Sequence, residues 1–76
     1  MDELIRERMR ELGVSVRGLH EALAASGVEV TRQAVDAWTK GRSRPRLEHV
    51  SPLCDALRMS AWERARLLDL AAGGAS

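Results

Sequence analysis

The segment 30–41, VTRQAVDAWTKG, concentrates polar side chains of the types that read DNA bases. Val35 and Trp38 are spaced three residues apart and predict the buried face of a helix over about 31–40. Arginine and glutamine can hydrogen-bond bidentately to guanine and adenine in the major groove, and the first turn of a recognition helix reaches the bases. Four residues on the outward face are therefore candidates for base readout: Arg32, Gln33, Asp36 and Ala37.

Basic residues dominate this part of the chain, although the whole sequence is nearly neutral. The formal net charge is +1, but segment 30–46 holds five basic residues and one acidic residue, a net +4, so the rest carries −3. Such a stretch attracts phosphates, or it is a solvated loop that happens to contain arginines. We predict phosphate contacts from polar and basic residues around the two central helices: Ser15, Arg17, Thr31, Lys40, Arg42 and Arg44.

Other chemistries lack candidate residues. His20, His49 and Cys54 do not form a recognisable metal-binding spacing. We expect His20 to pack between helices, with a DNA-contacting or pH-sensing role as the alternative, His49 to lie on the surface and Cys54 in the core. Paired carboxylates, an activated nucleophile and a glycine-rich phosphate loop are absent from the sequence. We therefore expect no enzymatic activity, no cofactor, no metal and no small-molecule ligand.

Length and composition favour one small helical domain. The 76 residues have room for one core, and alanine, leucine, arginine and glutamate are abundant. Cys54 is the only cysteine, so no intrachain disulfide can form, which suits a reducing compartment. The first 13 residues are charged throughout and no apolar run is long enough to span a membrane. We expect a cytoplasmic, nucleoid-associated, all-α domain over 1–76, with residues 73–76 frayed.

Five helices are predicted from their start and stop signals, at about 2–12, 15–26, 31–40, 47–57 and 60–71. Ser15 and Thr31 are N-caps, each with a hydrophobic staple across its first turn, and Ser60 and Glu63 form a capping box. Pro52 leaves two interpretations of the fourth helix. The helix begins about one residue before the proline, or it begins earlier and lacks one hydrogen bond.

The fifth helix has more apolar surface than one small core can absorb. Four of its residues are expected to pack inward: Ala61, Ala65, Leu68 and Ala72. The others would then form a contact between two copies, or would wrap the first helix: Trp62, Leu67, Leu70 and Ala71. One recognition helix reads only a few base pairs, so we expect a homodimer, at least on DNA, with Trp62, Leu67 and Leu70 at its contact.

Segment 15–60 resembles the lambda-repressor and Cro type of helix-turn-helix domain, the family that includes xenobiotic-response-element regulators. The features that carry the resemblance are Leu19 and Leu23 on the scaffold helix, the pattern Val-Thr-x-x-x-Val-x-x-Trp-x-x-Gly over 30–41, and the later Pro45, Leu47, Leu57 and Met59-Ser60. The resemblance implies a compact five-helix fold with a scaffold helix at about 15–26 and a recognition helix at about 31–40. It implies a sequence-specific transcriptional regulator, such as a small phage or mobile-element repressor or a Cro-like protein that occupies an operator on double-stranded DNA.

The sequence departs from this family between its two central helices. His20 stands where the family usually has a small residue, and about five additional residues separate Leu23 from Val30. Val16 and Gly18 replace a glutamine or glutamate that would contact phosphate. The alternative function is an antitoxin-like or other protein-interaction module whose main partner is a protein.

Overall fold

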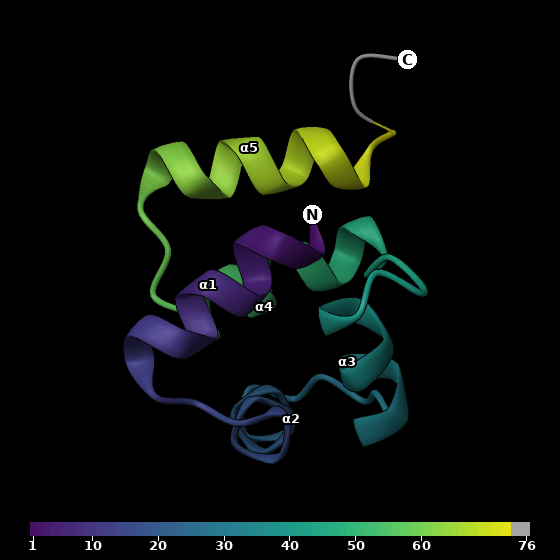
Figure 1. Cartoon of the computed structure of the whole chain (residues 1–76). Coiled ribbons are helices and arrows are strands. Elements are labelled where there is room, and N and C mark those ends of the chain that lie inside the picture. The colour runs from purple at the N-terminus through teal and green to yellow at the C-terminus, as the bar shows by residue number, and fades with distance from the viewer. Residues whose placement is uncertain (74–76) are drawn as a thin grey trace.

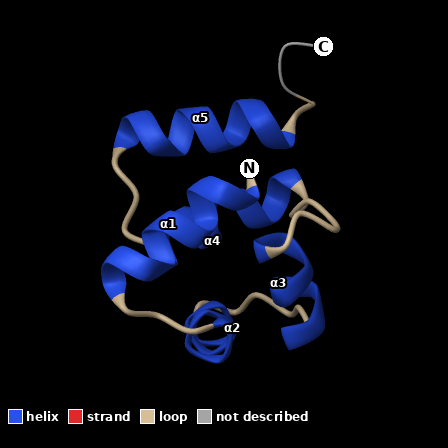
Figure 2. Cartoon of the chain, in the orientation of Figure 1, coloured by secondary structure: helices blue, strands red, loops and turns tan. Residues whose placement is uncertain are grey.

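Five α-helices and no strand make up residues 1–73, the part of the chain that the computed structural model describes. The helices are α1 (Asp2–Leu12), α2 (Val16–Ala25), α3 (Arg32–Thr39), α4 (Leu47–Ala56) and α5 (Ala61–Ala71), as Figures 1 and 2 show. The all-α class predicted from the sequence is therefore confirmed. Residues 73–76 were expected to be frayed. Gly73 lies in a turn after α5, and residues 74–76 lie outside the described part of the chain.

The core lies where α1 to α4 meet, and α5 adds one side chain to it. Contacts join α2 to α3, α4 to α5, α1 to α3 and α2 to α4. In Figure 1, α5 lies at the top of the molecule and α2 at the bottom, with α1 between them. The buried apolar residues are Ile5, Met9, Leu19, Leu23, Val35, Trp38, Val50, Leu53, Cys54, Leu57, Met59 and Leu67. The predictions that Trp38 and Cys54 belong to the core are confirmed.

Side-chain caps start α2, α3 and α5 where the sequence predicted them. The Ser15 hydroxyl accepts a hydrogen bond from the Gly18 amide at 3.0 Å, and Thr31 accepts from Ala34 at 3.0 Å. Ser60 and Glu63 exchange both bonds of a capping box. These bonds satisfy amides that a helix leaves unpaired at its N-terminus.

Pro52 lies inside α4, because the helix begins five residues earlier at Leu47. The second interpretation of this segment is therefore the right one. Proline has no amide hydrogen, so the Glu48 carbonyl lacks its partner four residues ahead. The helix ends at Ala56, and Arg58 follows in the left-handed region with φ 53°.

The predicted inward face of α5 is wrong. Leu67 is fully buried, whereas Leu68 is 39% exposed and the three alanines of the expected face are exposed. The buried side is fixed by Arg64, which donates to the Ser51 hydroxyl at 3.0 Å and pairs with Asp55 on α4. Burying Leu67 beside that arginine removes more apolar surface from water than burying alanines would.

His49 is half-buried, contrary to the prediction that it lies on the surface. Its ring centroid lies 6.0 Å from that of Trp38, and the two rings are tilted by 38°. The α4 backbone directs this side chain toward α3, where the large indole covers it. His49 therefore joins α4 to the buried side of α3.

Two arginines of α1 bind carbonyl groups at the C-terminal ends of other helices. Arg6 donates to the Thr39 carbonyl of α3 at 2.7 Å, and Arg8 donates to the Leu57 and Arg58 carbonyls that follow α4. Helix C-termini carry unpaired carbonyls and partial negative charge, so a guanidinium stabilises them. In this way α1 holds the end of α3 in place. No helix within residues 1–73 is both long and apolar enough to cross a membrane.

Candidate functional site

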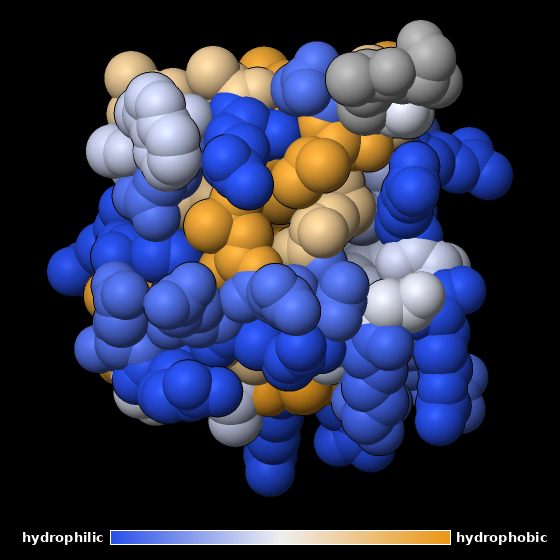
Figure 3. Space-filling model, turned by 45° about the horizontal axis from the view of Figure 1, so that its top comes forward, coloured by the Kyte–Doolittle hydropathy of each residue, from blue (hydrophilic) through white to orange (hydrophobic). Residues whose placement is uncertain are grey.

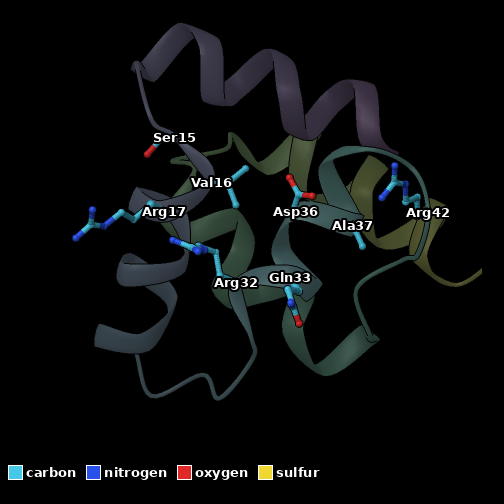
Figure 4. Close-up of a pocket in the computed structure, with 8 residues that line it drawn as sticks. All are labelled: Ser15, Val16, Arg17, Arg32, Gln33, Asp36, Ala37 and Arg42. Atoms are coloured by element: carbon cyan, nitrogen blue, oxygen red, sulfur yellow. The ribbon is translucent and has the colours of Figure 1, made fainter.

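An open groove of about 570 Å³ lies between the start of α2 and the outer face of α3 (Figure 4). The residues that line this α2–α3 groove are Ser15, Val16, Arg17, Arg32, Gln33, Asp36, Ala37 and Arg42. All of them except Val16 are residues that the sequence proposed for DNA contacts. The fold therefore brings together the four proposed base readers and three of the proposed phosphate contacts.

The first turn of α3 presents two polar side chains that take no part in the fold. Val35 and Trp38 are buried on the inner side of the helix, so Arg32 and Gln33 are exposed on the groove side. Within residues 1–73, neither side chain makes a hydrogen bond or an ion pair. Both keep their full donor capacity for a ligand, and Gln33 can also accept.

Positive charge lies at both ends of the groove. In Figure 4, Arg17 and Arg32 lie at one end and Arg42 at the other, with Asp36 and Ala37 between them. Both α2 and α3 direct their N-terminal turns to this surface, where the helix dipole is positive. The groove therefore favours an extended anionic ligand.

Two ion pairs modify this charge. The Lys40 ammonium lies 2.9 Å from the Asp36 carboxylate, and Arg17 lies 3.3 Å from Glu21. Exposed pairs of this kind contribute only about 0–1 kcal/mol each. A phosphate can therefore replace either carboxylate as a partner at small cost.

The turn after α3 is held by residues of α1 that the sequence analysis did not single out. Gly41 has φ 72°, and the Arg42 amide donates to the Ala37 carbonyl at 3.0 Å. A Cβ atom at Gly41 would lie 3.1 Å from the Asp2 side-chain carbon. The absence of that atom thus allows both the backbone turn and the close approach of α1. Asp2 is 39 residues from Gly41, so no local spacing in the sequence indicates this contact.

Three proposed phosphate contacts lie outside the groove lining: Thr31, Lys40 and Arg44. The Thr31 hydroxyl is used as the α3 cap, and Lys40 is paired with Asp36. Arg44 donates to the Leu70 carbonyl at 3.4 Å, near the C-terminal end of α5. Arg44 therefore points toward α5 and away from the groove.

The proposed dimer contact is only partly accessible. Trp62 is 68% exposed and Leu70 is half-buried, but Leu67 is fully buried and cannot touch a second copy. Leu67 is therefore removed from the predicted contact. Within the described residues 1–73, no group of three histidine, cysteine or acidic side chains could hold a metal ion.

Comparison of the chain with known protein families, with curated proteins and with solved structures found no match. A function therefore has to be argued from the chemistry of the groove.

Proposed function

We propose that this chain is a sequence-specific DNA-binding domain of helix-turn-helix type that regulates transcription by occupying an operator. In this proposal α2 is the scaffold helix and α3 the recognition helix. The observation that carries it is the pair of unengaged side chains, Arg32 and Gln33, on the first turn of α3, in a groove with arginines at both ends. The kind of regulator that we propose is a phage or mobile-element repressor or a Cro-like protein.

The residue types along α3 suit the edges of base pairs in the major groove, which is about 12 Å wide and admits one helix. Arg32 suits guanine and Gln33 suits adenine, because each can form two hydrogen bonds to one base. One turn further along, Asp36 can accept from a cytosine amino group and the Ala37 methyl can contact thymine. Arg17 and Arg42 would hold phosphates on either side of these bases.

One recognition helix reads only a few base pairs, so a second copy would be needed to recognise a longer DNA site. The α1–α5 groove, of about 390 Å³, is lined by Met1, Glu3, Leu4, Glu7, Trp62, Arg66 and Leu70. Figure 3 shows apolar side chains gathered in the middle of this face, with polar side chains around them. We propose that Trp62 and Leu70 contact a partner copy here, so that two recognition helices enter successive major grooves.

Selection of bound duplexes from a random DNA pool tests the proposal. We expect enrichment of one motif, repeated as a palindrome with half-sites about one helical turn apart. Affinity for that duplex should fall steeply with salt, with a log–log slope of about −0.9 per phosphate contacted. Arg42→Ala should flatten the slope by about one unit, and Arg58→Ala, an exposed arginine outside both grooves, is the matched control. A pool that remains random after selection would refute sequence-specific binding.

A protein-interaction module is the second candidate, and exposed apolar side chains favour it. Trp62 and Leu68 on α5 are 68% and 39% exposed, and Leu47 on α4 is 55% exposed. Large exposed apolar side chains of this kind can be buried when a protein partner binds. Weak binding to all duplexes alike, with no enriched motif, would favour this candidate over the regulator.

A further inference from the structure

The first residues of segment 26–31, which joins α2 to α3, are held by backbone hydrogen bonds to the last turn of α2. Gly27 has φ 85°, its amide donates to the Ala24 carbonyl at 3.0 Å, and the Val28 amide donates to the Leu23 carbonyl at 3.0 Å. These two bonds form a Schellman motif, which fixes the direction in which a chain leaves a helix. The beginning of the segment thus has one defined path.

The end of the same segment is fastened by a side chain of α2. The Nε2 atom of His20 lies 2.8 Å from the Val30 carbonyl oxygen, and the bond is partly buried. A carbonyl oxygen can only accept, so Nε2 has to carry the hydrogen of the neutral ring. Val30 directly precedes Thr31, whose hydroxyl caps α3. Backbone bonds and the His20 bond therefore hold the segment at both ends.

We propose that His20 is a positioning residue, which sets where α3 begins relative to α2 through its bond to Val30. The inference rests on the proposed function in one respect, namely that the position of α3 decides which bases Arg32 can reach. Arg32 is only two residues beyond Val30, so a shift of the segment moves it directly. Base contacts need hydrogen bonds of about 2.7–3.2 Å, and a shift of about 1 Å is enough to break them.

Two substitutions separate the hydrogen bond from the bulk of the ring. His20→Leu keeps an apolar side chain of similar reach without a donor, and His20→Gln keeps a donor near the place of Nε2. Glu29→Gln, an exposed change in the same segment, is the control. Melting temperature and helical circular dichroism show that each variant is folded.

The first readout needs no DNA. Residual dipolar couplings of the backbone amides give the angle between α2 and α3, and the ring nitrogen shifts show which nitrogen carries the hydrogen. We expect Nε2–H in the wild type, a changed angle in His20→Leu, and the wild-type angle in His20→Gln and Glu29→Gln. A neutral ring with hydrogen on Nδ1 alone, or an unchanged angle in His20→Leu, would overturn the proposal.

The second readout is the ratio of affinities for the selected duplex and for a random duplex. His20→Leu should lower this ratio by about tenfold, as expected when a bidentate base contact is weakened, and His20→Gln should keep most of it. Equal losses in both variants would mean that the bulk of the ring matters rather than the bond. A wild type with no preference for any duplex would refute the proposed function and the specificity role, while the dipolar couplings still decide whether His20 positions α3.

Discussion

Arg32 and Gln33 are exposed and have no partner within residues 1–73, so their replacement should change binding without changing stability. Arg32→Ala or Gln33→Ala should cost about 1–3 kcal/mol on the selected duplex and much less on random DNA. Fluorescence anisotropy titrations with both duplexes measure the difference, and Arg58→Ala, outside both grooves, is the control. An equal loss on both duplexes would reassign the residue to phosphate contact.

Arg58 occupies a backbone conformation that suits glycine. Its φ of 53° lies in the left-handed region, where a Cβ atom is strained, and its exposed side chain makes no hydrogen bond in the described part of the chain. Arg58→Gly should raise the free energy of unfolding by about 0.5–1 kcal/mol. Arg58→Ala keeps the Cβ atom and should give no gain. Urea unfolding of both variants checks this, and equal stabilities would contradict the strain argument.

At the scale of elements, the contact between α1 and the end of α3 should depend on pH. The Arg6 guanidinium donates to Asp2 and holds the pKa of that carboxyl below its ordinary value. Because the pKa of the Asp2 carboxyl is lower in the folded state than in the unfolded state, its ionised form stabilises the fold. This stabilisation is fully present at pH values above the unfolded pKa and is lost as the pH falls through the folded pKa.

The stability difference between the wild type and Asp2→Asn should therefore shrink as the pH is lowered from about 5 to about 2. Urea unfolding at a series of pH values measures it. In an Arg6→Gln background the same Asp2→Asn change should show much less of this dependence, because the main cause of the pKa shift is gone. A difference that stays constant with pH would contradict the role of the pair.

Helix positions and caps could be predicted from the sequence because their signals are local. Ser15, Thr31 and the Ser60–Glu63 box act within one helical turn, and all three were confirmed. The buried face of α5 could not be predicted, because it depends on the Arg64 bonds to α4.

Most residues that line the α2–α3 groove could be predicted from the sequence. They lie on two helices that follow each other in the chain, and their outward positions follow from the helical spacing of the buried residues. The contact of Asp2 with Gly41 joins distant parts of the chain, and no sequence pattern marks it.

One contact links the side chain at position 20 to the segment that joins α2 to α3. The His20 ring bonds to the Val30 carbonyl, the last one before the cap of α3, and a small residue at position 20 could not reach it. The histidine and the connecting segment therefore have to be considered together.

At the scale of the whole molecule, the exposed indole of α5 should decide the oligomeric state. The Trp62 side chain is 68% exposed, although the Arg66 guanidinium lies 5.6 Å from its ring centroid. Trp62→Ala should abolish the dimer and retain half-site binding, because it removes the largest exposed apolar surface of the proposed contact. Sedimentation equilibrium with and without a palindromic duplex measures this, and Leu47→Ala on α4 is the control. A wild type that stays monomeric on the palindrome would exclude this interface.

The most direct test of the central claim is a map of the surface that DNA touches. Amide chemical shifts of the labelled protein are followed during titration with the selected duplex. We expect the largest changes at the residues of the α2–α3 groove, above all Arg32, Gln33 and Arg42, and small changes along the outer face of α5. Changes confined to α5, with the groove residues unaffected, would contradict the assignment of α3 as the recognition helix.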